Sequence, residues 1–327
     1  MQDTQGTTRT ALAGVVFMIA GVSLFPIMNT FAKSLTVEFI LWQVIWARFA
    51  GHLLVTTFVF LPRRGFALFQ TQKPGRQLLR STIFFGSNVC FIAALPHVSL
   101  ATASSIMFTA PVLVTLMSVW FLSERIGIWR WSAVLAGFVG AVIIIRPGDN
   151  DFNAATLLVL GSAVCYSTYQ LLTRSLTTDD AADTQIVYTA LVGAVVTTLV
   201  VPFVARVPDT LAQVGSFAAI GCLGALGHFL VIEALKRASA SVVAPLGYVE
   251  LVGATALGFF VFGDFPDKYT WIGAGLIVGS GLVIAYRQSR SGRAGKGLPR
   301  GVTYYLPQFM TGCGVLMMFA ALLLGLR

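Results

Sequence analysis

The feature that most constrains this chain is a series of apolar runs, each close to the length that crosses a bilayer. A membrane-spanning helix needs about 20 mainly apolar residues. Ten runs approach or reach that length, at residues 11–32, 39–61, 79–95, 100–122, 130–146, 154–174, 185–205, 212–234, 240–262 and 270–286. The connections between them are short, and none could fold as a separate soluble domain. The sequence therefore predicts an all-α polytopic membrane protein.

Composition and charge agree with that prediction. Of the 327 residues, 56% are hydrophobic and only 11% are charged, whereas soluble domains carry about 25% charged residues. The net charge of +9 does not indicate a nucleic-acid partner, because most Lys and Arg residues lie between the apolar runs. The expected surroundings are a lipid bilayer, in a multi-pass protein of the bacterial inner membrane that is a monomer or a homodimer.

Basic connections predict the orientation of the chain. The connection after the second run and the segment after the tenth run are rich in Lys and Arg and contain no acid. Positive connections stay on the cytoplasmic side, so both are expected there, together with the N-terminus. The connection after the sixth run contains Asp179, Asp180 and Asp183 beside Arg174, but acids count for little in this rule.

The last part of the chain, residues 288–327, reads as a basic linker followed by an extra transmembrane helix. Residues 305–326, "YLPQFMTGCGVLMMFAALLLGL", are long and apolar enough to span. Tyr304 and Tyr305 would then lie in the interfacial aromatic belt. Reporter fusions at residues 295 and 327 should lie on opposite sides of the membrane.

The chain also repeats itself at a spacing of about 140 residues. At this offset Ala94 matches Ala234, and Trp131 matches Trp271. The match predicts two five-helix units, residues 11–147 and 153–287. Because five is odd, the two units would be inserted in opposite directions. Inverted repeats are typical of secondary transporters, which hold their substrate near the midplane between the halves.

Several motifs resemble the EamA-type drug/metabolite transporter superfamily. They are "ATASSIMFTAPVLVTLMSVWFLSER" in the first unit, its second-unit counterpart "ASASVVAPLGYVELVGATALGFFVFGD", and "WQVIWARF" in the second run. The resemblance covers about residues 11–287 and implies a ten-helix, 5+5 inverted-repeat bundle. Leu251 departs from the family pattern, which often has proline there, and the family's ten-helix members have no counterpart to the segment after residue 300.

Glu250 is an acid in the middle of the ninth apolar run. Its neighbours on the same helical face would be Gly247, Gly253 and Ala254, small residues that mark close helix packing or a cavity rather than lipid. An ionisable residue inside the membrane is a functional candidate by default. Glu250 is therefore a candidate for proton coupling or cation contact, and a hydrogen-bonded packing role is the alternative.

Two other ionisable residues lie within apolar runs. His228 has Gly221, Gly224 and Ala225 on its predicted face, so it should point into the protein, where it could carry a proton, bind a ligand or simply pack. Arg48 lies near the middle of the second run. The cost of its charge in lipid predicts that it is paired or faces water, and a structural ion pair is the favoured interpretation.

The sixth run carries a polar and aromatic stripe. Ser162, Tyr166, Tyr169, Gln170 and Thr173 recur at helical spacing on an otherwise apolar helix, which indicates a cavity wall. The complete set of substrate-binding candidates consists of Asn29, Asn88, Ser105, Tyr166, Tyr169, Gln170, His228, Tyr248 and Glu250.

The sequence contains no motif that indicates nucleotide hydrolysis or metal binding. There is no phosphate-binding glycine loop with lysine and no H-E-x-x-H motif, and the three histidines and four cysteines lack metal-ligand spacing. We therefore expect no catalytic residues, no metal site and no cofactor.

These features favour a secondary transporter that moves a small organic metabolite by alternating access, driven by a proton gradient or by the solute gradient. Export of amino acids or amphipathic compounds is the commoner theme of the resembled family. Uptake of a vitamin or nucleotide-like metabolite is the alternative, since tyrosines could stack on a planar ring. A membrane-embedded enzyme acting on lipid and a structural or receptor-like subunit are hypotheses of other classes.

Overall fold

A computed structural model describes residues 2–122, 127–147, 152–176, 180–237 and 244–290. Within these ranges the regular elements are all helical. The sequence-predicted span at 305–326 lies outside the described residues, so the number of spans beyond residue 290 stays a prediction.

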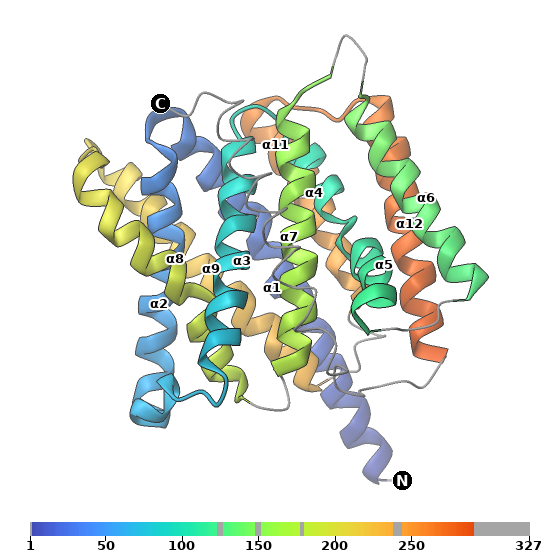
Figure 1. Cartoon of the computed structure of the whole chain (residues 1–327), viewed down its shortest axis with the longest axis horizontal. Coiled ribbons are helices and arrows are strands. Elements are labelled where there is room, and N and C mark those ends of the chain that lie inside the picture. The colour runs from blue at the N-terminus through green and yellow to red at the C-terminus, as the bar shows by residue number, and fades with distance from the viewer. Residues whose placement is uncertain (1, 123–126, 148–151, 177–179, 238–243, 291–327) are drawn as a thin grey trace.

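Ten crossings follow one another through the bundle (Figure 1). The elements are α1 (Gln2–Glu38), α2 (Leu41–Arg64), η1 (Gly65–Phe69), α3 (Pro74–Ala94), α4 (Leu100–Met107), α5 (Ala110–Leu122), α6 (Ile128–Ile145), α7 (Ala155–Leu176), α8 (Ala182–Val204), α9 (Leu211–Arg237), η2 (Ala244–Tyr248), α11 (Val249–Phe262) and α12 (Lys268–Arg290).

Seven of the described helical segments are long and apolar enough to cross a membrane, and the segments 131–145 and 246–262 are apolar but shorter. The helix α3 is different because much of its polar content faces the protein. Gln77, Arg80, Ser87 and Asn88 are all buried there. Such a helix can cross the membrane because its neighbours, rather than lipid, cover its polar side.

The helices of the two halves pair with one another in a regular pattern. Contacts join α1 to α9, α2 to α8, α3 to α7, α4 to α11 and α6 to α12. Figure 1 shows α6 beside α12 at one side of the bundle and α2 beside α8 at the other. When the first five crossings are exchanged with the second five, the pair α1–α9 becomes the pair α7–α3, and each of the other three pairs becomes itself. A pseudo-two-fold axis between the halves would produce this pattern.

Two crossings are interrupted near their middle. The fourth consists of α4 and α5, separated at Phe108 and Thr109, and Pro111 follows at the start of α5. Proline lacks an N–H and cannot continue the helical hydrogen-bond ladder. The hydroxyl of Ser167 on α7 donates to the carbonyl of Ala110 (3.2 Å). In the described part of the ninth crossing, the short helix η2 leads directly into α11, so the helix geometry changes at Tyr248.

Glycines set the closest approach between helices α2 and α9. A Cβ atom placed on Gly221 would lie 2.6 Å from Cα of Gly51 and 2.9 Å from the carbonyl oxygen of Ala47. Backbone atoms cannot move aside as a flexible side chain can. The contact therefore depends on glycine at this point, as is common where membrane helices pack through small residues.

We expect Gly221→Leu to force α2 and α9 apart and to lower the thermal stability of the detergent-solubilised protein. Overpacking of a well-packed contact costs about 1–3 kcal/mol, and a clash with backbone should fall at the upper end. Gly215→Leu on the same helix is the control, because a Cβ atom there meets nothing within 4 Å. Equal unfolding midpoints for the two variants would contradict this account of the contact.

Candidate functional site: a central cavity

A cavity of about 360 Å³ lies at the centre of the bundle, between the two halves. Described helices from both units contribute its walls. The described lining consists of Met18, Val22, Phe25, Met28, Asn29, Arg48, Phe84, Ser87, Asn88, Phe91, Ser104, Met107, Phe108, Ala110, Pro111, Ser162, Tyr166, Gln170, His228, Val231, Gly247 and Glu250.

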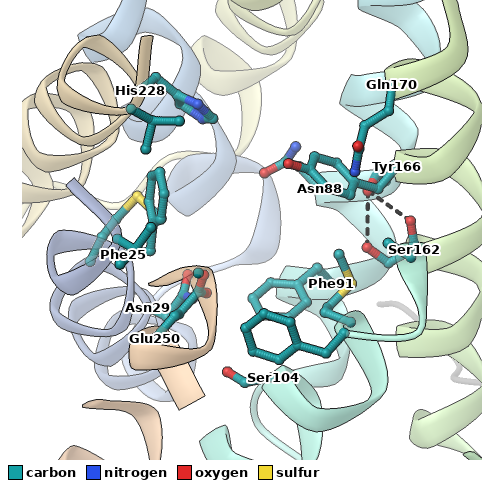
Figure 2. Close-up of a pocket in the computed structure, with 18 of the residues that line it drawn as sticks. Phe25, Asn29, Asn88, Phe91, Ser104, Ser162, Tyr166, Gln170, His228 and Glu250 are labelled. Carbon is teal, nitrogen blue, oxygen red and sulfur yellow. Dashed lines mark hydrogen bonds between the residues drawn. The ribbon is translucent and has the colours of Figure 1, made fainter. Parts of the chain in front are cut away.

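The cavity has two contrasting walls (Figure 2). One wall comes from α1, α9 and α11, where Phe25, His228, Asn29 and Glu250 lie together, with Glu250 beside Asn29. The opposite wall comes from α3, α4 and α7. A ligand between them would contact both halves of the chain at once.

The α3–α7 side of the cavity is held by side-chain hydrogen bonds. The Ser87 hydroxyl donates to the backbone carbonyl of Ser162 (2.9 Å) and lies 3.0 Å from the Ser162 hydroxyl. The amide nitrogen of Asn88 donates to the carbonyl of Phe84 (2.8 Å). Because its nitrogen is engaged, Asn88 has its side-chain oxygen left to accept a bond from a ligand.

Aromatic rings give the cavity flat apolar surfaces. The ring of Phe84 lies 6.4 Å from that of Tyr166, and Phe25 packs at 5.1 Å against the imidazole of His228. Phe91 and Phe108 add further rings to the lining. Surfaces of this kind suit a planar ligand, which they can contact face to face or edge to face.

Two charged side chains, Glu250 and Arg48, reach this mainly apolar space. The guanidinium of Arg48 hydrogen-bonds the thioether sulfur of Met28 (2.9 Å), a weak acceptor. Among the described residues, neither Arg48 nor Glu250 has an ion-pair partner within 4 Å, although the two charges act on each other electrostatically. The cavity lining therefore contains one basic and one acidic side chain that are not bonded to each other.

The structure brings most of the sequence-predicted site residues into this lining. Asn29, Asn88, Tyr166, Gln170, His228 and Glu250 all line the cavity. Arg48, predicted as a structural ion-pair partner, lines it as well. The sequence reasoning did not select the phenylalanines Phe84, Phe91 and Phe108 or the serines Ser87 and Ser104, which look like ordinary core residues in an apolar chain.

Three predicted candidates are not part of the described lining. Ser105 is buried behind its neighbour Ser104. Tyr169 lies below the guanidinium of Arg80, 5.2 Å from ring centre to Cζ. Tyr248 packs on Phe108 with ring centres 4.9 Å apart. Each is one layer away from the cavity.

One end of the bundle, where α1 ends and α12 begins, is tied across the two halves. We refer to it as the Lys33 end. The buried ammonium of Lys33 donates to the carbonyl of Val98 (2.9 Å) and to the carboxylate of Asp264 (2.7 Å), and it lies 4.8 Å from the ring centre of Phe262. Lys33 thus joins α1 to the segments that flank α4 and α11.

We expect Lys33 and Asp264 to be energetically coupled. Asp264→Asn leaves a buried ammonium without its counter-charge, so it should lower stability more than the double variant Lys33→Met/Asp264→Asn does. The coupling should be about 1 kcal/mol in a double-mutant cycle of thermal unfolding midpoints. Additive effects of the two single variants would show that the pair does not hold this end.

The opposite end, where α1 begins, has its own ties. The carboxylate of Asp180 accepts bonds from the Thr71 hydroxyl (2.6 Å) and the Gln77 amide (2.7 Å), which joins the α2–α3 connection and the start of α3 to the end of the α7–α8 connection. Burial opposes ionisation of Asp180, but these hydrogen bonds outweigh it and lower the pKa of its carboxyl. The tie is therefore intact at neutral pH and is lost only as pH falls through that lowered pKa.

The cavity is displaced away from the Lys33 end. Its α1 residues extend from Asn29 back to Met18, and its α9 residues are His228 and Val231, in the half of α9 that leads to the opposite end.

In the part of the chain that the structure describes, no group of three or more His, Cys, Asp or Glu residues is placed to hold a metal ion.

Comparisons with known proteins agree with this architecture. The EamA-like transporter family matches the chain twice, over residues 12–146 and 153–286. The S-adenosylmethionine uptake transporter of Rickettsia bellii is 30% identical over 68% of this chain and 76% of its own length. The riboflavin transporter of Vibrio cholerae is 29% identical over 86% of this chain and 96% of its own length. The pseudopaline exporter of Pseudomonas aeruginosa is 28% identical over 81% of this chain and 93% of its own length.

A solved crystal structure shares the fold. It superposes with a TM-score of 0.59 at 21% sequence identity, over 88% of this chain and 99% of the other. The sequence-based prediction of an all-α polytopic bundle is confirmed.

Proposed function

Because the chain belongs to the EamA-like transporter family, we propose that it is a secondary transporter that moves a small organic metabolite across the cytoplasmic membrane through the central cavity. The observation that carries this proposal is the cavity itself. Residues of both halves line it, and Lys33 joins the two halves at one end of the bundle. Transporters of this general design hold their substrate between two halves that rock against each other.

The two five-helix units, 11–147 and 153–287, would supply the moving parts. The exchange-symmetric pairing of helices, with α1 on α9 and α3 on α7, supports an inverted-repeat relation between them. With the N-terminus in the cytoplasm, as the basic connections predict, the Lys33 end faces outward. In this orientation the bonds of Lys33 would join the two halves at the outer end, and the cavity would lie nearer the cytoplasmic end.

The lining favours a substrate that combines a planar ring with polar groups. Rings such as Phe84 and Tyr166 offer stacking surfaces, and Asn29, Asn88 and Gln170 offer amide hydrogen bonds. Two of the relatives are transporters of ring-containing metabolites, S-adenosylmethionine and riboflavin. We therefore favour uptake of such a metabolite over the export of amino acids or amphipathic compounds, for which the pseudopaline exporter is the nearest precedent among these relatives.

Energy would come from a proton gradient acting through Glu250, with His228 as the second titratable group of the cavity. The two side chains lie on the same wall, on α11 and α9 (Figure 2). A proton and a positively charged part of the substrate could therefore compete for the Glu250 carboxylate. Such competition would link the movement of one to that of the other.

A metabolite screen tests the proposal. Cells that express the wild-type protein should accumulate or lose a specific metabolite relative to cells that express Ser104→Phe, which places a ring inside the cavity. Leu54→Phe is the matched control, because Leu54 is 69% exposed on the outer surface of α2, and it should behave as wild type. Identical metabolite profiles for wild type and Ser104→Phe, at equal levels of membrane-inserted protein, would argue against transport through this cavity.

A further inference from the structure

We infer that the cavity selects a zwitterionic metabolite, with Arg48 receiving a carboxylate, Glu250 receiving an ammonium group, and the aromatic rings receiving a planar ring of the same molecule. The inference rests on the proposed function and narrows its substrate class to ring-containing compounds that carry both a carboxylate and an ammonium group.

The charges of the cavity lead to this class. Arg48 and Glu250 carry the formal charges among the described lining residues, and they come from different helices, α2 and α11. Arg48 has a thioether as its hydrogen-bond acceptor, and Glu250 has no hydrogen-bond partner among the described residues. Each is a charge in a mainly apolar cavity, which is costly unless a partner is supplied.

A ligand that pairs with Arg48 and Glu250 when both side chains are ionised must have two opposite charges of its own. A simple cation would leave Arg48 uncompensated, and a simple anion would leave Glu250 uncompensated. A neutral ligand would leave both without partners. A zwitterion compensates both charges and adds no net charge to the site, and its carboxylate matches the forked donor geometry of a guanidinium.

Neighbouring side chains complete the two halves of this site. Asn29 lies beside Glu250 on the same wall of the cavity (Figure 2). Its side-chain oxygen could accept a second hydrogen bond from the same ammonium group. The wall that carries Tyr166 and Phe91 faces them across the cavity, where it offers a surface for the ring of the same ligand.

Binding to the purified full-length protein tests the inference with probes that share a ring and differ in charge. One series consists of tryptophan, tryptamine and 3-indolepropionate, which carry both charges, only the positive charge and only the negative charge. The second consists of S-adenosylhomocysteine, which carries both, and adenosine, which carries neither. In at least one series, the zwitterion should bind at least about tenfold more tightly than its analogues, as expected for desolvated charge pairs.

Variants assign each charge to its residue. Arg48→Gln should reduce the affinity for the zwitterion about tenfold or more and leave the affinity for tryptamine unchanged. Glu250→Gln should reduce the affinity for the zwitterion and leave the affinity for 3-indolepropionate unchanged. Arg206→Gln and Asp209→Asn are the controls, because these residues form an exposed ion pair outside the cavity. If Arg48→Gln does not fold, Arg48→Lys retains the charge and should still prefer tryptophan to tryptamine.

Each result decides for or against the inference. Equal binding of zwitterions and their analogues in both series, or no binding of any probe, overturns it. If a metabolite from the cell screen crosses proteoliposomes and neither Arg48→Gln nor Glu250→Gln changes its affinity, the zwitterion inference fails and the transport proposal stands. If folded protein in proteoliposomes moves neither these probes nor any metabolite from the screen, the transport proposal itself fails.

Discussion

Glu250→Gln should abolish gradient-driven accumulation of substrate while the protein remains inserted and folded. Glutamine keeps the shape of the side chain and removes its titration. If Glu250 carries the proton of the cycle, the variant should still exchange substrate for substrate at saturating concentration, because exchange without net movement needs no proton. Uphill uptake driven by an imposed pH gradient should fall to the background of empty liposomes.

The comparison that matters is uphill uptake against exchange, each measured across a range of pH. Asp209→Asn serves as the control, because this acid lies in an exposed ion pair with Arg206. Normal uphill transport with an unchanged pH profile would make Glu250 a packing residue, and the coupling role would then pass to His228 or disappear. Loss of folded protein would instead give Glu250 a structural role, with its electrostatic interaction with Arg48 as the first to test.

Arg80→Met should cause the largest loss of stability among single side-chain changes. Arg80 is only 1% exposed. Its guanidinium donates to the carbonyl of Gln185 and to the hydroxyls of Thr189 (2.9 Å) and Thr173 (3.2 Å), so it links α3 to both α7 and α8. Methionine fills much of the volume but leaves these buried acceptors without a donor.

We expect this substitution to lower the free energy of unfolding by about 3–5 kcal/mol, the usual cost of removing one partner from a buried charged interaction. Arg64→Met is the matched control. Arg64 pairs with Asp183 at 2.9 Å, but its side chain is 46% exposed, and exposed pairs contribute about 0–1 kcal/mol. Thermal unfolding of the two variants in the same detergent provides the comparison. Similar midpoints would show that the bonds of Arg80 are replaced by water or by rearrangement.

The membrane crossings could be predicted because length and hydropathy determine them almost alone. The places where helices break could not. The structure separates α4 from α5 at Phe108, before Pro111, and Ser167 of α7 donates to the Ala110 carbonyl beside this break. Likewise, α3 looks too polar for a span until its buried contacts with α7 and α8 are seen.

Some residues of the cavity lining could be selected from the sequence. Glu250 and His228 were selected as ionisable residues in apolar runs, and Asn29 and Asn88 as repeat counterparts of the sixth-run stripe and of His228. The structure places all four in the cavity lining. Phe84 and Phe91 were missed, since phenylalanine in such a chain carries no signal until the fold shows which rings border a cavity.

Helical spacing predicted which residues line the cavity only to within about one position along the helix. Ser104 and Ser105 differ by about 100° around α4, and the structure places the first in the lining and the second in the core. Tyr166 and Tyr169 belong to one stripe of α7, but Tyr169 lies where Arg80 and Thr189 approach and Tyr166 lies at the cavity. Which edge of a stripe faces a cavity depends on the neighbouring helices.

The most direct test of a central-cavity transporter is counterflow in proteoliposomes. Liposomes loaded with the unlabelled metabolite from the cell screen should transiently concentrate the labelled form when they contain wild-type protein or Leu54→Phe. Liposomes that contain equal amounts of folded Ser104→Phe should not. Equal counterflow through wild type and Ser104→Phe would show that the substrate takes another path, and the absence of counterflow with wild type would contradict transport altogether.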